Sequence, residues 1–179
     1  YRGARATLDN SGPVIHGLLA VWGNPKAWTK ALEMSYRAWG VVPPGAQRGE
    51  TALDMFFRNY NKTRETAGRL NAGQWAARGL IINGADTEFQ LGQGAFQKLS
   101  KAPGIRNANR AFGAFGDTIR LEWVDDILEQ ELRTRTLQQI TDSGDLELIA
   151  KSINGATGWS ERRFAGSLGD LTLFAPRFF

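Results

Sequence analysis

Apolar side chains recur every three or four residues over one long stretch, and this spacing constrains the fold more than any other feature. The positions are Phe112, Phe115, Ile119, Trp123 and Ile127, and Val124, Leu128 and Leu132 widen the same stripe. A step of three or four places side chains on one face of an α-helix, whereas a strand needs a step of two. We therefore expect a long helix that begins near Asn107 and runs to about Ile140.

Such a helix is long for a chain of 179 residues. About thirty helical residues span roughly 45 Å. Acidic residues precede Arg133 and Arg135 along it, an order that the helix dipole favours. A rod of this length needs neighbours along its whole surface, so we expect it to belong to an assembly.

Shorter helical patterns fill the rest of the chain, separated by glycine and proline. Asparagine followed by proline, at Asn24-Pro25, is a helix start, and Gly40 follows the end of that helix. Five other helices are predicted. They are a helix from Pro13 to Trp22, a helix that begins at Thr51 or Glu50, a helix from Gln74 to Ile82, a short helix from Phe96 to Ser100, and a helix from Asp145 to the glycines at 155 and 158. Leu80-Ile81-Ile82 is the only strand candidate.

The patterns predict an all-α fold, with many helices in an extended assembly, glycine- and proline-rich joints, and one long helix near 107–140. We divide the chain into a region of short helices (1–105), the long helix (106–142) and a helix, turn and amphipathic tail (143–179). The first residue is not methionine and the chain ends on Phe178-Phe179. We therefore expect a fragment of a much longer polypeptide.

Composition places the chain among ordinary globular proteins. Hydrophobic residues make up 42% and charged residues 22%. There is no cysteine, which excludes disulfides, thiolate nucleophiles and cysteine-ligated zinc. The net charge of +4 is mildly basic and permits, without requiring, a polyanionic partner. No apolar run reaches the ~20 residues of a membrane span.

No residue pattern indicates catalysis. His16 is the only histidine and has no second ligand at metal-binding spacing. Asp125, Asp126 and Glu129 fall on one helix, where we expect a solvated acidic face rather than a catalytic pair. Gly92-Gln93-Gly94 matches no phosphate-binding loop. We predict no catalytic, cofactor-binding or metal-binding residue and no enzymatic activity in this segment; an activity elsewhere in the parent chain remains open.

Two groups of residues are candidates for binding. Basic residues near aromatic ones could contact phosphate, although a plain solvated surface is the simpler interpretation; they are Arg58, Lys62, Arg64, Arg162 and Arg163. The six tryptophans serve either the core or subunit contacts, where tryptophan concentrates. Our candidate interaction surface consists of Phe112, Phe115, Ile119, Trp123, Ile127, Leu168, Leu171, Phe174, Arg177 and Phe178.

Three short blocks carry a family resemblance. The most specific is the tail, with Asn154-Gly155-Ala156-Thr157-Gly158 followed by Leu173-Phe174 and Pro176-Arg177-Phe178. The second comprises Phe96 to Ile105, then Asn109-Arg110-Ala111-Phe112 and Ile119-Arg120, and the third is Asp9 to Pro13 with Asn24-Pro25. In their order along the chain, the three blocks resemble the large polyvalent protein associated domain of giant tailed-phage proteins.

The resemblance implies a structural and assembly segment of an internal virion protein, also called an ejection protein. Such a protein is packaged in the capsid near the portal and delivered into the host with the genome, ending in the cell envelope. Its implied partners are sister copies in a homo-oligomer and the portal or other virion proteins, with packaged DNA a further candidate.

Two phage-related alternatives stay open. One is a basic helical module that binds packaged DNA. The other is a non-catalytic part of a large virion enzyme, such as a virion RNA polymerase or a lytic transglycosylase. A helical protein unrelated to phages is a further alternative.

Overall fold

The computed structural model describes residues 18–39, 44–47, 50–82 and 103–157. Within these ranges the fold is all-α, as predicted, with seven helices and no strand. The helices are α3 (Leu18–Gly23), α4 (Pro25–Ala38), α5 (Ala52–Thr66), α6 (Ala72–Ala77), α8 (Pro103–Glu131), α9 (Leu137–Asp142) and α10 (Asp145–Ala156). None of the helices in these ranges is both long and apolar enough to cross a membrane.

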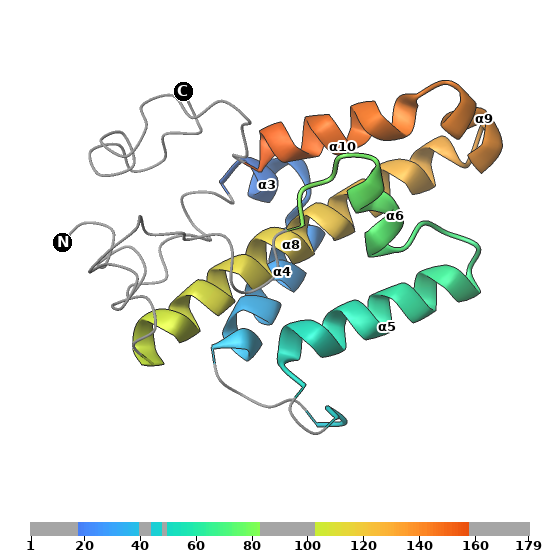
Figure 1. Ribbon diagram of the computed structural model, residues 1–179. Helices are drawn as coiled ribbons and strands as arrows, with labels where there is room; N and C mark the ends of the chain where they lie inside the picture. The colour runs from blue at the N-terminus through green and yellow to red at the C-terminus, as the bar shows by residue number, and fades with distance from the viewer. Residues whose placement is uncertain (1–17, 40–43, 48–49, 83–102, 158–179) are drawn as a thin grey trace.

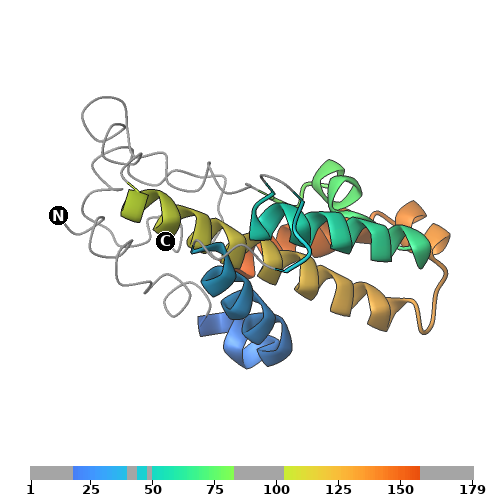
Figure 2. The ribbon, with the colours of Figure 1, turned by 90° about the horizontal axis from the view of Figure 1, so that it is seen from below.

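The long helix α8 runs through the middle of the molecule (Figure 1). In that view α10 lies along one side of α8 and α5 along the other. Helices α4 and α6 lie on opposite sides of the layer formed by α5, α8 and α10, as the view turned by 90° also shows (Figure 2). Within the described residues, the same chain therefore supplies the neighbouring helices that a long helix needs.

Side-chain caps define where several helices begin. The Asn24 side chain accepts a hydrogen bond from the backbone N–H of Ala27 at 3.0 Å, and Pro25 occupies the first turn of α4. Thr51 and Asp54 form a capping box at the start of α5. Both helix starts are confirmed as predicted.

The long helix ends earlier than predicted, at Glu131 rather than near Ile140. Thr136 and Gln139 form a capping box that starts a separate helix, α9. Arg135 holds the intervening turn, because its guanidinium lies 2.5 Å from the Glu131 carboxylate and 2.7 Å from that of Asp145. The apolar periodicity continues across this break, which is why the pattern did not reveal it.

Three other boundaries differ from the prediction. Helix α8 begins at Pro103 rather than near Asn107. Helix α6 ends at Ala77, and Gly79 then adopts a left-handed conformation (φ +90°) that redirects the chain into the segment 80–82, which is neither helix nor strand. Helix α10 continues to Ala156, one residue past Gly155, the first of the two glycines expected to end it. The predicted helix over Phe96 to Ser100 and the tail beyond 157 lie outside the described residues.

The core divides into two clusters on different faces of α8. The larger joins α8 to the α5–α6 region and to α9 and α10; its buried members are Tyr60, Leu70, Ala72, Trp75, Leu80, Leu121, Val124, Leu128, Ile140, Leu146, Ala150 and Ile153. The smaller joins α4 to α8 through Ala27, Ala31, Phe115 and Ile119. Trp123 packs against both clusters and so connects them.

Gly23 sets how closely the α3–α4 corner approaches α8. A Cβ at this position would lie 2.7 Å from Cζ2 of Trp123, whose ring is already held between the two clusters. Gly155 differs: it is exposed in α10, and a Cβ there would have no atom within 4 Å.

We predict that Gly23→Ala lowers the free energy of unfolding by about 1–3 kcal/mol, because the added methyl group displaces the indole ring. The matched Gly155→Ala should instead raise it by about 0.5–1 kcal/mol, since alanine favours the helix. Urea denaturation of both variants measures the difference. Equal effects at the two positions would contradict the close packing of Trp123 on Gly23.

Candidate functional site

Arg120 is the centre of a buried polar junction, which we define as Asp117, Arg120, Asn154 and Thr157. Arg120 is only 2% exposed, in the middle of α8. Its Nε donates a hydrogen bond to Oγ1 of Thr157 at 3.1 Å, and its Nη1 donates to the carbonyl oxygen of Ile81 at 3.2 Å. The same Nη1 lies 3.4 Å from the carboxylate of Asp117, one turn earlier.

Asn154 completes the junction from α10. Its side-chain oxygen accepts a hydrogen bond from the backbone N–H of Ile81 at 3.0 Å, and its amide donates to the carbonyl of Gly79 at 2.7 Å. The extended segment after α6 is thus hydrogen-bonded through its backbone to α8 and α10. These contacts satisfy backbone groups that would otherwise be costly to bury.

The junction brings together residues from two of the sequence blocks singled out in the sequence analysis. Arg120 belongs to the block on α8, and Asn154 and Thr157 belong to the block at the end of α10. All three side chains are buried. Their arrangement fixes the helices relative to one another.

A second buried group lies nearer the C-terminal end of α8. We call it the carboxylate cluster, and it consists of Tyr60 and Arg64 from α5, Trp75 from α6 and Asp125 from α8. The Arg64 guanidinium lies 2.7 Å from the Asp125 carboxylate and 5.2 Å from the centre of the Tyr60 ring. The Tyr60 hydroxyl and the Trp75 indole lie beside the same carboxylate.

Burial dominates the electrostatics of this cluster. It raises the pKa of Asp125 to about 6, against the opposing effects of Tyr60, Arg64 and Trp75. The Tyr60 hydroxyl and the Trp75 N–H do not reach well-formed hydrogen-bond geometry, so they stabilise the carboxylate less than burial destabilises it. Burial, followed by the charge of Asp125, also raises the pKa of Tyr60 far above its ordinary value.

A groove of about 280 Å³ opens beside the carboxylate cluster. It lies between α4, α5 and α8 and is lined by Met34, Arg37, Ala52, Met55, Phe56, Asn59, Tyr60, Thr63, Arg64 and Glu122. Both methionines of the chain are among these residues. The charged groups in its lining are paired within the protein: Arg37 with Glu33, Arg64 with Asp125, and Glu122 with Lys30.

The acidic face expected on the long helix is solvated only in part. Glu129 is exposed, as expected. Asp125 is buried, and Asp126 is half-buried and accepts a hydrogen bond from the Asn24 side chain. The prediction of a solvated face is wrong for Asp125 because it considered one helix alone, whereas the partner arginine comes from α5.

The predicted interaction surface turns largely inward where the structure describes it. Phe115 and Ile119 are 3% and 1% exposed and pack in the smaller core cluster with residues of α4. Trp123 and Ile127 are half-buried against the larger cluster, and Phe112 is also half-buried. Leu168, Leu171, Phe174, Arg177 and Phe178 lie outside the described residues. Contact of this surface with other proteins stays a prediction.

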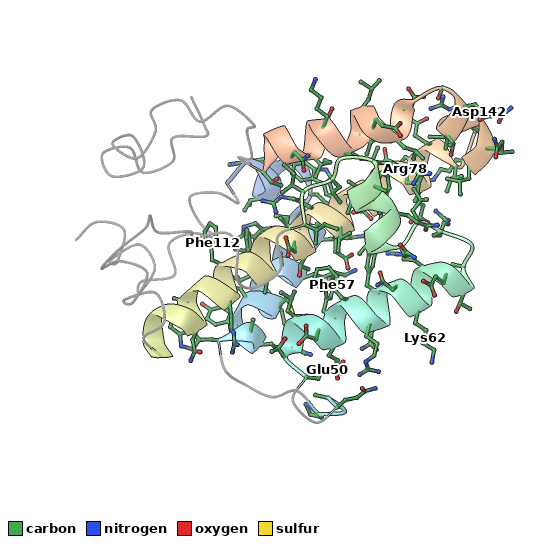
Figure 3. The ribbon with its side chains drawn as sticks, in the orientation of Figure 1. Glu50, Phe57, Lys62, Arg78, Phe112 and Asp142 are labelled. Carbon is green, nitrogen blue, oxygen red and sulfur yellow. The ribbon has the colours of Figure 1, made fainter. Side chains whose placement is uncertain are left out.

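Two of the predicted phosphate-binding residues in the described ranges are already engaged. The Arg58 guanidinium forms two hydrogen bonds with the Glu50 carboxylate, at 2.7 and 3.0 Å, and Arg64 is paired with Asp125. Lys62 is exposed, forms no ion pair within the described part of the chain, and points from α5 away from the other helices (Figure 3). Arg162 and Arg163 lie outside the described residues.

The described residues contain no group of three or more histidine, cysteine, aspartate and glutamate side chains that could hold a metal ion. His16 lies outside these ranges. Comparison with protein-family models, curated proteins and solved structures finds no match to this chain.

Sequence reasoning missed the carboxylate cluster entirely. Its members come from three helices, and nothing in the spacing of Tyr60, Arg64 or Trp75 indicates that they meet Asp125. One signal was available: Arg64 falls one turn after Tyr60 on the stripe that α5 buries, and an arginine on an apolar face needs a buried acid.

Replacing Arg120 with methionine should lower the free energy of unfolding by about 3–5 kcal/mol, because Asp117 loses its contact with the buried guanidinium and the buried Thr157 hydroxyl and Ile81 carbonyl lose their donor. The control is Arg133→Met, at an exposed position just beyond α8, which should change stability by less than about 0.5 kcal/mol. Chemical denaturation measures both variants. Similar small losses in the two proteins would show that the junction is not a structural element.

Proposed function

We propose that this chain is a structural and assembly segment of an internal virion (ejection) protein of a tailed phage. The observation that carries the proposal is the meeting of Arg120 with Thr157 in the buried junction. Two separate blocks that resemble the phage family supply these residues. Both blocks supply residues to the same contact between α8 and α10, and this shared structural role accounts for their occurrence in one chain.

The chemistry of the junction favours scaffolding over catalysis. Its polar groups bond to one another and to backbone atoms, and a catalytic acid, base or nucleophile needs access to substrate. We therefore assign the described residues no catalytic role and place any activity of the parent protein in other segments.

Delivery through a narrow channel fits a helical chain of this composition. The chain has no cysteine, and the described helices are held by side-chain packing, hydrogen bonds and ion pairs. Non-covalent contacts can be undone one helix at a time and formed again, whereas a disulfide or a structural metal would resist unravelling. In this proposal the protein travels from the capsid interior to the host envelope.

The proposed partners are sister copies of the chain, the portal and other virion proteins. Contacts would use the tail residues of the candidate interaction surface together with exposed apolar side chains of the described helices. Trp22, 84% exposed on α3, and Leu148, 61% exposed on α10, are such side chains. Tryptophan in particular is enriched at protein–protein interfaces relative to the rest of the surface.

The proposal predicts where the protein is found. Mass spectrometry of purified particles of the encoding virus should detect peptides of this chain after external protease treatment, because the capsid shields them. Particles emptied of DNA by triggered ejection should lose these peptides and keep the major capsid protein, which is the control. Absence of the chain from particles, or its retention after ejection, would overturn the proposal.

A salt titration distinguishes assembly from the DNA-binding alternative. Two of the three candidate cations in the described ranges are paired with carboxylates, so we expect weak binding to duplex DNA at physiological salt. Affinity that is high at low salt and falls steeply as salt rises would instead favour a phosphate-binding module.

A further inference from the structure

Trp22 is the most exposed large apolar side chain in the described part of the chain. Its exposed fraction is 84%, and that of Val21 beside it is 37%. Lys26, four residues later, is also exposed and forms no ion pair with a described residue. We call these three residues the tryptophan corner. Tryptophan is among the side chains that most often anchor a protein interface by filling a pocket on the partner, so the corner is suited to a pocket on another protein surface.

The groove between α4, α5 and α8 has a lining that suits an indole ring. Met34, Met55 and Phe56 make up most of its apolar part. Thioether sulfur makes favourable contacts with aromatic rings, and flexible methionine side chains adjust to the shape of an inserted group. The groove volume of about 280 Å³ lies just below that of pockets for drug-sized ligands, a size that suits one large side chain.

The polar part of the groove favours an uncharged donor. Arg37, Arg64 and Glu122 are each paired with another residue of the same chain, so a charged occupant would find no free counter-ion among them. Asn59 and Thr63 also line the groove, and their exposed side chains form no hydrogen bond with the described residues. Their oxygens can accept a hydrogen bond from an indole N–H, which is a donor only.

Trp22 is remote from the groove of its own chain, because α3 and α5 lie on opposite sides of α8 in both views (Figures 1 and 2). We propose that Trp22 of one copy inserts into the groove of a second copy, an inference that rests on the proposed role of sister copies in assembly. The contact joins two different surfaces of the chain. It is therefore heterologous and can be repeated to form a ring or a filament.

Charge complementarity supports the same pairing. Lys26 supplies the unpaired cation of the tryptophan corner. Glu33 lies beside the groove, where it is bound to Arg37 and keeps a side chain that is 59% exposed. With Trp22 in the groove, Lys26 is brought toward this carboxylate. An exposed ion pair adds little affinity, so the cation orients the two copies and the indole supplies most of the binding free energy.

Sedimentation velocity of the full chain over a range of concentrations tests the contact. The chain should self-associate, and Trp22→Ser should weaken the association by about tenfold or more because it removes the anchor. Asn59→Arg should weaken it as strongly, since the longer side chain fills the groove and adds an unpaired cation to it. Both positions are exposed, so neither change removes a core contact. Leu148→Ser, at an exposed apolar residue of α10, is the control and should leave the association unchanged.

Mixing the two variants tests the heterologous geometry. Trp22→Ser copies keep an open groove, and Asn59→Arg copies keep the indole. Each variant alone should stay monomeric, whereas an equimolar mixture should form a dimer and nothing larger. A mixture that stays monomeric, or association of the unmodified chain that survives Trp22→Ser, would overturn the proposal. So would an unmodified chain that is monomeric at every concentration.

The outcome is separable from that of the proposed function, which is tested by the presence of the chain in virus particles. A chain that is packaged and ejected but never self-associates would overturn the contact alone. A chain that self-associates through Trp22 but is absent from particles would overturn the virion assignment and leave the contact in place.

Discussion

The close approach of α4 to α8 is the constraint on which the rest of the structure depends. Ala27, Ala31 and Ser35 recur every four residues along α4 and are all buried. Their small side chains form a flat ridge that lets Phe115 and Ile119 of α8 pack directly against the helix. Because α4 covers one side of α8, the other sides are left for α5, α6 and α10 to cover.

Polar groups then specify how each remaining element is oriented. Apolar packing alone tolerates rotation and sliding, whereas a buried charge or amide must meet a partner at one position. Arg120 and Asp125 impose this requirement on opposite sides of the same helix region: Arg120 fixes α10 and the segment after α6, and Asp125 fixes α5. The function proposed here uses the same property, since a scaffold must present its surfaces in a defined arrangement.

Local chemistry made most helices predictable. Asn24-Pro25 and Thr51 mark starts that the structure confirms, because a cap acts within one turn of sequence. Contacts between elements were not predictable to the same degree. The apolar stripe of α8 was correct, yet its coverage by α4 could not be read from Ala27 and Ala31, since alanine is found on exposed helix faces as well as on buried ones. The ion pair between Arg64 and Asp125 was missed because the two residues belong to different helices far apart in the sequence.

One substitution pair tests the central claim that α4 lies directly on α8. Ala31→Leu places three extra carbon atoms at a position with no exposed surface and should lower the free energy of unfolding by about 1–3 kcal/mol. Lys26→Leu adds an apolar side chain at an exposed site on the same helix and should change stability by less than about 0.5 kcal/mol. Equal, small changes in urea denaturation of the two variants would contradict the account.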